Sequence, residues 1–329
     1  MKINQLFDLS KNYFYIVDTS YIVFCAASAA FKDYVYQNDV PKSSLSPDFD
    51  PTLDQEFNVI LRDKFIARIE NAIRSYSPFT FNKSNFIFTV DCPRKEIWRR
   101  EIFPEYKLTR DTADHSKDEF NIGKVFKYVY DFIIPNYCEE TGSIVVQSSY
   151  AESDDIIFVL TKKLLNDSKD NLIVILSSDR DMVQLYDERV SILTIQNEVR
   201  EPKKELEALT KTEIKEDVDV NDFLLFKILI GDGSDNIPSV KHRLGPKGAL
   251  KYVLDKSRSN LKELLKEDVN ILNGFKRNKK LISMNKIPSY MVESITESID
   301  EAFANRKKVE KVDPIEKVDE VDDILKDIL

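Results

Sequence analysis

The stretch NLIVILSSD, residues 171–179, decides the fold. Its apolar residues follow one another without alternation, which is typical of a strand buried on both faces of a parallel sheet. An acid, Asp179, closes the turn that follows. Three other short runs have the same form: NYFYIVD ends at Asp18, NFIFTVD ends at Asp91, and GSIVVQSS leads to Glu152.

Segments with helical spacing separate these runs. Residues 54–76 and the stretch AESDDIIFVLTKKLLND (151–167) each carry an apolar stripe, and RVSILTI (189–195) indicates a further strand. This alternation predicts an α/β fold with a mainly parallel central sheet flanked by helices. From about Val220 the pattern becomes helical, and residues 37–51 form a turn-rich polar loop.

The composition excludes several classes of protein. A chain of 329 residues with 42% hydrophobic and 11% aromatic residues is globular. Three scattered cysteines and two histidines give no disulfide framework, zinc site or Ser-His-Asp triad. No apolar run reaches the ~20 residues that span a bilayer, and the N-terminus lacks a signal peptide. We therefore expect a soluble protein of a reducing cytoplasm.

Acidic residues follow several of the predicted strands. Because the carboxyl ends of parallel strands meet at one edge of a sheet, we expect Asp18, Asp91 and Asp179 to converge there. Each acid has an ordinary explanation as a helix cap or turn residue, such as Glu152 completing a capping box with Ser149. The acids of interest are Asp18, Asp91, Glu152, Asp154, Asp155, Asp179, Asp181, Asp232 and Asp235.

Taken together, the nine acids favour a metal site. Carboxylates gathered in one place repel one another and raise each other's pKa unless cations lie among them. Oxygen ligands favour Mg²⁺ or Mn²⁺, and two such ions about 4 Å apart support hydrolysis of a phosphodiester. The net charge of −9 argues against a nucleic-acid partner only if the acids are spread evenly.

Two segments are locally basic. In GDGSDNIPSVKHRLGPKGAL (231–250) two aspartates precede Lys241, His242, Arg243 and Lys247. In RKEIWRREIFPEYKLTR (94–110) cations alternate with aromatic residues, a pattern suited to stacking bases and holding phosphates of a single strand. A solvated amphipathic helix with its aromatic residues in the core explains the second segment equally well.

These segments together carry a family resemblance. The strand ending at Asp18, DCPRKEIWRREIFPEYKLTR, AESDD, SSDRDMVQL and GDGSDNIPSV…LGPKGA occur in this order. The chain thereby resembles the 5′-nuclease (flap endonuclease) superfamily, most closely its tailed-bacteriophage RNase H and 5′→3′ exonuclease branch. The resemblance implies a PIN-like α/β core and a helix–hairpin–helix (H3TH) region.

The resemblance also implies an activity. Such enzymes are 5′→3′ exonucleases and flap endonucleases that act on branched or nicked duplex DNA and RNA–DNA hybrids with two Mg²⁺ or Mn²⁺ ions, and in phage replication they remove RNA primers. The first metal site maps to Asp18, Asp91, Glu152, Asp154 and Asp179. The second maps to Asp155, Asp181, Asp232 and Asp235.

The basic segments receive roles from the same resemblance. Residues 92–120 match a helical arch in which Lys107 and Arg110 reach the scissile phosphate, with Asp18 and Asp179 in the catalytic centre. Arg99 is a further DNA contact, and Tyr106 either stacks on a base or packs at a hinge. In the hairpin, the expected duplex contacts are Ser239, Lys241, Arg243, Gly245 and Lys247. The family often binds K⁺ there, but Arg243 stands where a glycine is common.

Two other functions remain open from the residues. A PIN-like ribonuclease shares the acidic α/β site, and a catalytically inactive DNA-junction binder shares the basic surfaces. A third alternative is the N-terminal nuclease domain of a repair polymerase. We expect instead a free-standing enzyme that is a monomer.

The predicted domains are an α/β core (1–219), a helical region (220–312) and an acidic tail (313–329). The tail is either solvated or docks on a sliding clamp or single-strand-binding protein. If the chain is phage-encoded, its place is the host cytoplasm.

Overall fold

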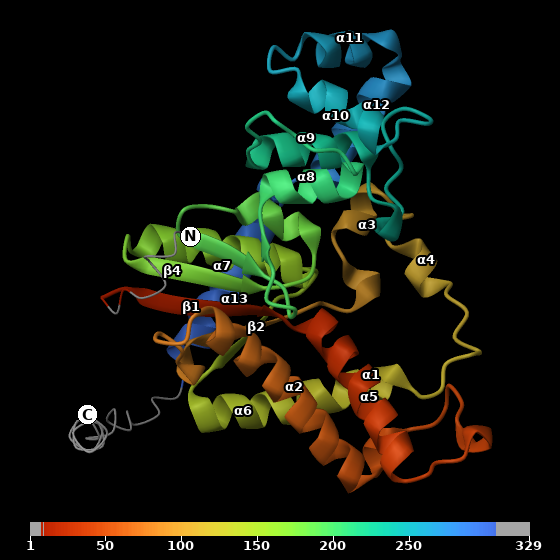
Figure 1. The fold of residues 1–329 in the computed structure, drawn as a ribbon, viewed down its shortest axis with the longest axis vertical. Helices are drawn as coiled ribbons and strands as arrows, with labels where there is room; N and C mark the ends of the chain where they lie inside the picture. The colour runs from red at the N-terminus through yellow and green to blue at the C-terminus, as the bar shows by residue number, and fades with distance from the viewer. Residues whose placement is uncertain (1–7, 9, 307–329) are drawn as a thin grey trace, which may run out of the picture.

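The computed structural model describes residues 8 and 10–306 and contains one six-stranded sheet (Figure 1). The strand order is β3-β2-β1-β4-β5-β6, and every pairing is parallel except that of β6 with β5. The strands are β1 (Asn12–Asp18), β2 (Phe86–Val90), β3 (Ile144–Gln147), β4 (Asn171–Leu176), β5 (Val190–Leu193) and β6 (Val199–Arg200). The mainly parallel α/β fold predicted from the buried runs is confirmed.

Helices cover both faces of the sheet, as the continuous apolar strands require. Side chains alternate across β1, so Tyr15 and Val17 enter one core and Ile16 enters the other. The first core is covered by α1 (Thr19–Gln37), α2 (Gln55–Tyr76), α5 (Ile122–Tyr128) and α6 (Ile134–Thr141). The second is covered by α7 (Ser153–Asp167) and α13 (Ser289–Ala304).

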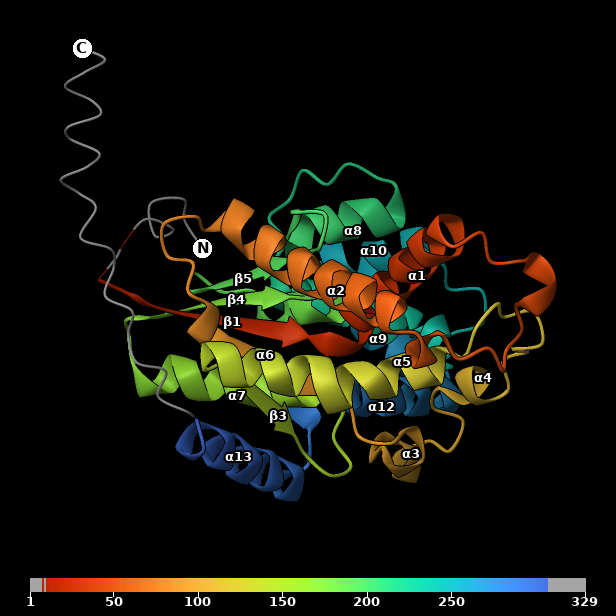
Figure 2. The same ribbon diagram turned by 90° about the horizontal axis from the view of Figure 1, so that it is seen from below.

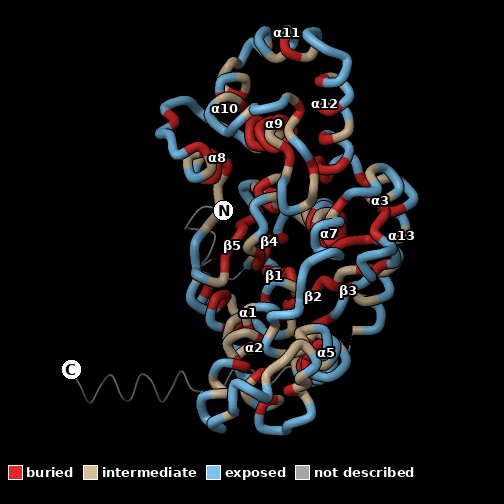
Figure 3. Tube along the Cα trace, turned by 90° about the vertical axis from the view of Figure 1, so that its right-hand side faces the viewer, coloured by how far each residue is buried: buried red, intermediate tan, exposed pale blue. Residues whose placement is uncertain are grey.

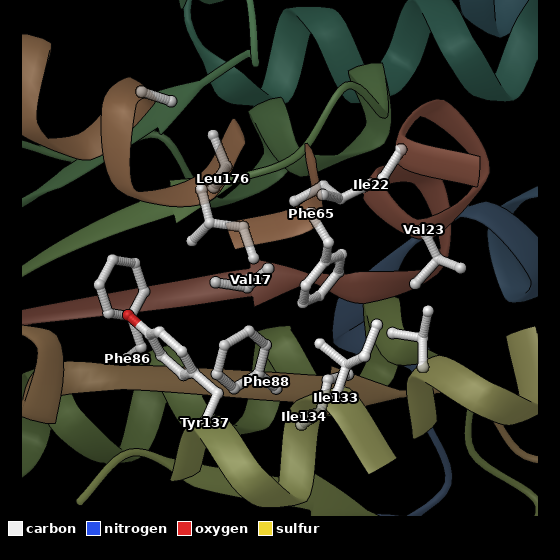
Figure 4. Packing of buried hydrophobic residues seen from close by; sticks show 14 of the residues in the cluster. Val17, Ile22, Val23, Phe65, Phe86, Phe88, Ile133, Ile134, Tyr137 and Leu176 are labelled. Atoms are coloured by element: carbon white, nitrogen blue, oxygen red, sulfur yellow. The ribbon is translucent and has the colours of Figure 1, made fainter. Parts of the chain in front are cut away.

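The two cores are clearly separated by the sheet. Figure 2 shows α13 and α7 on the side of the strands away from α1 and α2. In Figure 4, Phe86 and Phe88 of β2 lie against Tyr137, and their rings form part of the first core. These layers fix the carboxyl ends of the strands as a rigid edge.

A helical region lies beyond this edge (Figure 1). It consists of α8 (Pro202–Thr210), α9 (Val220–Ile230), α10 (Pro246–Leu254), α11 (Ser259–Glu267) and α12 (Val269–Ile282), which share one apolar core. Helix α9 ends at Ile230, and α10 begins at Pro246 directly after Gly245, so the basic hairpin lies between these two helices.

The domain boundaries differ from the prediction at two helices. Leu206 of α8 packs into the core of the helical region, so that region begins before Val220. Ile295 and Ile299 of α13 pack on the sheet, so this helix returns to the α/β core. The sequence around α8 and α13 does not indicate which core each helix joins, because the apolar stripe of each helix could pack on either core. The predicted acidic tail, 313–329, lies outside the described residues.

The basic segment 92–120 forms the connection between β2 and α5. It contains two short helices, α3 (Arg99–Ile102) and α4 (Leu108–Asp111), and α3 packs against α12. Within residues 8 and 10–306, no helix combines the length and the apolar character needed to cross a lipid bilayer.

Candidate active site

The carboxyl ends of β1, β2 and β4 meet at the first residues of α7. The backbone N–H of Ser153 donates to Asp91 Oδ1 at 2.7 Å, and its hydroxyl donates to Asp18 Oδ1 at 3.4 Å. The hydroxyl of Ser177, just after β4, donates to the other oxygen of Asp18 at 2.7 Å and accepts from the N–H of Asp179. The predicted convergence of acids from distant parts of the chain is therefore confirmed.

The negative charges of these carboxylates repel one another. Burial and then the charge of Asp91 raise the pKa of Asp18 to about 7. Burial, followed by the charges of Asp179 and Asp18, raises the pKa of Asp154 well above its usual value. A cation placed among these side chains would relieve the repulsion.

Two cations of the basic segment 92–120, which we call the arch segment, reach the carboxylates gathered at the sheet edge, which we call the acidic cluster. Lys107 donates from Nζ to Glu152 Oε1 and lies 3.9 Å from Asp235 Oδ1. Arg110 pairs with the same oxygen of Asp235 at 2.8 Å and remains 45% exposed along its side chain. Although burial opposes ionisation, Lys107 and then Arg99 hold the pKa of Glu152 below its usual value. The predicted catalytic cations are thus brought to the predicted metal ligands.

A third cation, Lys227 of α9, was not among the predicted site residues. Its Nζ lies 2.7 Å from Asp232 Oδ2 and 3.1 Å from Asp181 Oδ1, and the side chain is only 9% exposed. Burial raises the pKa of Asp181 to about 7 despite Lys227, while Lys227 holds the pKa of Asp232 down against burial. Its signal in the sequence is a lone cation inside the apolar helix VNDFLLFKILI.

Asp155, predicted as a ligand of the second metal, is held by side chains of the protein itself. It is fully buried, and both of its oxygens pair with the guanidinium of Arg99, at 2.7 and 2.9 Å. Trp98 Nε1 also donates to it at 2.8 Å. Asp155 further closes a capping box with Glu152 at the start of α7, so the expected box with Ser149 is wrong. These contacts suit a side chain that positions its neighbours rather than one that binds an ion.

Arg99, predicted to contact DNA, and Tyr106, predicted either to stack on a base or to pack at a hinge, are both buried. Arg99 is 4% exposed and joins Glu152 and Asp155 to the carbonyl of Leu281. Tyr106 is 3% exposed, and its hydroxyl donates to Glu152 and Asp235 at 3.0 and 3.2 Å. Trp98 and Tyr106 thus pack internally, as in the helix alternative, but the segment forms two helices of 4 residues each and not an amphipathic helix.

The carboxylate oxygens at this edge are ligands that suit a hard divalent cation, but several of them pair with Lys and Arg side chains of the protein itself. Among residues 8 and 10–306, no three His, Cys, Asp or Glu side chains are arranged to hold a metal ion. The reason is that Lys107, Lys227 and Arg110 draw Glu152, Asp232 and Asp235 toward themselves. The buried Oδ1 of Asp181 likewise lies 3.1 Å from Nζ of Lys227, so a cation of the chain stands beside this oxygen as well.

A cleft of about 610 Å³ opens beside the cluster. Its lining includes Asp179 and Asp232 together with Arg180, Lys227 and Tyr21. It lies between the sheet edge and α8–α9, and it gives solvent and substrate access to the carboxylates of Asp179 and Asp232.

Some of the hairpin residues that we predict to contact duplex DNA already bond other groups of the protein, and others are exposed. Lys241 pairs with Glu267 at 2.5 Å, and Ser239 donates its hydroxyl to the carbonyl of Lys241. Arg243 and Lys247 are exposed and, within the described part of the chain, make no ion pair. Gly245 is the N-cap of α10 and is exposed.

The backbone conformation at Arg243 explains why a glycine is common at this position of the hairpin. Its φ of 60° lies in the left-handed region that glycine occupies without strain. The chain therefore keeps the backbone turn that a glycine favours, and gains a cation there at a cost in conformational energy.

Several known proteins are similar to this chain in sequence. A 5′-3′ exonuclease from Buchnera aphidicola subsp. Schizaphis graminum is 33% identical over 56% of this chain and 56% of its own length. A DNA polymerase I from Caldicellulosiruptor bescii is 29% identical over 56% of this chain and 21% of its own length. The chain thus spans about half of the first relative and about a fifth of the second.

Solved structures share the fold at low sequence identity. The T5 D15 protein co-crystallised with metal ions has a TM-score of 0.58 at 17% identity, covering 89% of this chain and 99% of that one. A pseudo-enzyme–product complex of the bacteriophage T5 D15 flap endonuclease with DNA and metal ions also has a TM-score of 0.58 at 17% identity, covering 88% and 99%.

A family model described as "5′-3′ exonuclease, N-terminal resolvase-like domain" matches residues 14–219. This match extends from β1 through α8 and includes Asp18, Asp91, Asp154 and Asp179. Because it covers more than half of the chain, the protein belongs to the 5′-3′ exonuclease family defined by that N-terminal resolvase-like domain.

Proposed function

We propose that the protein is a divalent-metal-dependent 5′→3′ exonuclease and flap endonuclease. It hydrolyses phosphodiester bonds in branched or nicked duplex DNA and in RNA–DNA hybrids. Family membership supports the reaction class, and the likeness to the T5 flap endonuclease supports the architecture in which it takes place.

One observation carries the proposal: two cations of the arch segment are joined to the acidic cluster at the sheet edge. Lys107 contacts Glu152, and Arg110 contacts Asp235. An arch that only covered the surface would have no need to place its cations among the carboxylates. A phosphate that entered this site would meet Lys107 and Arg110 beside the candidate metal ligands, where positive charge stabilises a developing oxyanion.

The residues that would hold two Mg²⁺ or Mn²⁺ ions are proposed from their place at the edge. The first group is Asp18, Asp91, Glu152, Asp154 and Asp179, and the second is Asp181, Asp232 and Asp235. When bound, such ions supply activation of water and stabilisation of the leaving oxygen. We assign Asp155 to positioning Arg99 and Trp98, because these side chains already occupy its oxygens.

The chain's own cations have two tasks in this proposal. Lys107 and Arg110 hold the scissile phosphate after exchanging a carboxylate partner for it. Arg243 and Lys247 hold a phosphate of the duplex at the N-terminus of α10, where free backbone N–H groups also favour an anion. None of these contacts reads a base, so cleavage follows structure rather than sequence.

The K⁺ site of the hairpin stays a prediction. The carbonyl of Lys241 already accepts hydrogen bonds from the hydroxyl of Ser239 and the N–H of Leu244. A K⁺ ion at this carbonyl would therefore share it with two donors.

Within a cell we propose that the enzyme removes RNA primers during phage DNA replication, acting as a monomer. A sliding clamp or a single-strand-binding protein is the proposed partner of the acidic tail. A PIN-like ribonuclease is the main alternative, and the arch and hairpin cations weigh against it, because cutting single-stranded RNA does not need a duplex grip.

The test compares labelled substrates of equal length: a 5′-flap duplex, a nicked duplex, an RNA-primed duplex and single-stranded RNA. We expect cleavage of the three duplexes near the junction or 5′ end with Mg²⁺ and none with EDTA. Cleavage of the single-stranded RNA alone would establish the ribonuclease, and tight binding of the flap without any cleavage would establish an inactive junction binder.

A further inference from the structure

Helix α12 carries an unusual concentration of positive charge. Its fourteen residues contain Lys276, Arg277, Lys279 and Lys280 and no Asp or Glu, in a chain whose net charge is −9. The three lysines are exposed, and we call them the α12 lysine face. Arg277 is excluded, because its guanidinium lies over the ring of Phe103 and bonds the carbonyl of Pro238.

The α12 lysine face has no carboxylate partner. Within residues 8 and 10–306, Lys276, Lys279 and Lys280 make no ion pair and no side-chain hydrogen bond. By contrast, Lys241 and Lys256 in the same helical region each pair with an acid at 2.5 Å. Other lysines of this region also make no ion pair among the described residues, so what distinguishes α12 is that it gathers four cations on one helix without an acid: the others are Lys247, Lys251, Lys262, Lys266 and Lys286.

Folding gains little from this arrangement. Lys276 and Lys280 stand four residues apart on one side of the helix, where like charges destabilise it. Attraction to the helix dipole accounts for Lys279 and Lys280 in the last turn, but not for Lys276, which lies before that turn. A charge kept at a cost to folding points to a partner.

The opposite side of α12 is firmly anchored. Asn278, fully buried, donates to the carbonyls of Ile228 and Pro238 at 2.9 Å each. Gly274 of the same helix is buried beside the backbone of Val240. The lysines therefore stand on a rigid support beside the hairpin, and Figure 3 shows the outer side of α12 facing solvent above α3.

The anchoring also fixes the distance to the acidic cluster. Arg99 donates to the carbonyl of Leu281 in the last turn of α12 and pairs with Glu152 and Asp155 at the sheet edge. A nucleic acid lying on α12 would thus leave the helix at the arch, next to Lys107.

We propose that the α12 lysine face binds the phosphate backbone of a double helix, outside the hairpin and the arch. The inference rests on the proposed function, which brings duplex nucleic acid to this edge of the molecule. The exposed residues of α12 include no aromatic side chain, so the face lacks the stacking groups that single strands require. Four helical residues rise about 6 Å, which spans about two charges of one strand.

The test measures binding of the full-length protein to a labelled 5′-flap duplex in EDTA, so that no cleavage occurs, at several NaCl concentrations. Two released counterions correspond to a change of about 2 in the slope of log K against log salt. We expect Lys276→Gln with Lys280→Gln to reduce the slope by about 2. The double variant with arginine at both positions should keep the slope of the wild type.

The matched control is Lys211→Gln with Lys215→Gln, which removes the same charge from two exposed lysines that follow α8 in the chain. Figure 3 shows α8 and α12 on opposite sides of α9. We expect this control to leave the slope unchanged. Equal slope losses in both glutamine variants would overturn the proposal, because the effect would then come from net charge alone. A loss that appears on single-stranded DNA and not on the duplex would overturn it as well.

The outcome is separable from that of the proposed function. If the wild type cleaves no substrate but the slope changes as expected, the nuclease assignment fails and the surface stands. If the wild type cleaves flaps but the slope of the α12 variant is that of the wild type, only the surface proposal fails. Thermal unfolding of each variant, expected at the Tm of the wild type or slightly above, shows that it is folded.

Discussion

Asp154 and Asp155 are neighbours in the chain, yet the first turn of α7 places them in opposite surroundings. Successive residues of a helix point about 100° apart, because one turn holds 3.6 residues. Asp154 therefore joins Asp18 and Asp179, whose charges help to raise its pKa, whereas Asp155 meets the guanidinium of Arg99. The charge of Asp154 is repelled by neighbouring carboxylates, whereas the charge of Asp155 is paired with a guanidinium.

Substitution of these two residues should change stability in opposite directions. Asp154→Asn removes a charge repelled by other acids and should raise the free energy of unfolding of the metal-free protein at pH 8 by about 1 kcal/mol. Asp155→Asn leaves Arg99 with a single buried partner and should lower it by about 3 kcal/mol. Urea unfolding in EDTA, followed through the fluorescence of Trp98, the only tryptophan, measures both. Equal destabilisation by the two variants would contradict the different surroundings.

Lys227 supplies positive charge between two acids that we propose as metal ligands. Lys227→Met should lower the free energy of unfolding in EDTA by about 2–4 kcal/mol, because Asp181 and Asp232 lose a mostly buried partner. Mg²⁺ should recover much of this loss, since a divalent ion replaces the missing charge. The measurement is urea unfolding of variant and wild type with EDTA and with Mg²⁺. An equal loss under both conditions would show that no ion takes the place of Lys227.

The turn that follows α9 joins the sheet edge to the hairpin, and its geometry depends on one glycine. Gly231 has a φ of 72°, and Asp232 and Ile237 exchange two backbone hydrogen bonds of 2.8 Å across the turn. The turn holds Asp232 toward Lys227 and Asp235 toward Lys107. The acids and the basic hairpin are therefore adjacent because one tight turn connects them.

Gly231→Ala should be severely destabilising. An added Cβ would lie 2.3 Å from the carbonyl oxygen of Ile237, a backbone atom that cannot move away without breaking the turn. Together with the left-handed φ, this should cost about 3 kcal/mol or more. The control is Gly233→Ala, two residues on, where a Cβ would meet no atom within 4 Å. Thermal unfolding of the two variants compares them, and similar Tm values would refute this view of the turn.

Much of the α/β core is predictable because strands buried on both faces have a continuous apolar sequence. The runs ending at Asp18, Asp91 and Asp179 identified three strand ends, and the parallel arrangement brought those acids together. The helix ending at Ile230 and the start of α10 at Pro246 follow from local turn chemistry. Each of these features is encoded within about ten residues.

Contacts between distant parts of the chain were not predictable in the same way. Arg99 has the sequence context of a DNA contact, and its burial depends on Leu281, 182 residues away. The return of α13 to the sheet depends on a face left open by α7, which no local pattern records. Lys227 shows a weak signal only, because a cation in an apolar helix does not identify its partners.

At the scale of the whole molecule, charge is divided between two regions. Residues 239–286 contain thirteen Lys and Arg against four Asp and Glu, although the chain as a whole is acidic. The sheet edge gathers acids, whereas cations predominate in the helical region, which Figure 1 shows beyond that edge. This division resolves the apparent conflict between a net charge of −9 and a nucleic-acid partner, since an electrostatic grip depends on local charge.

The central claim is that the acids at the sheet edge are the hydrolytic centre of a flap-cleaving enzyme. Asp179 tests it most directly, because it ends the decisive stretch, is exposed to the cleft, and makes no ion pair among the described residues. The measurement is single-turnover cleavage of a 5′-labelled flap with Mg²⁺ by wild type and by Asp179→Asn, with binding measured separately in EDTA. We expect the variant to bind the flap within about threefold of the wild type and to cleave it at least about a hundredfold more slowly. Cleavage by the variant at the rate of the wild type would contradict it.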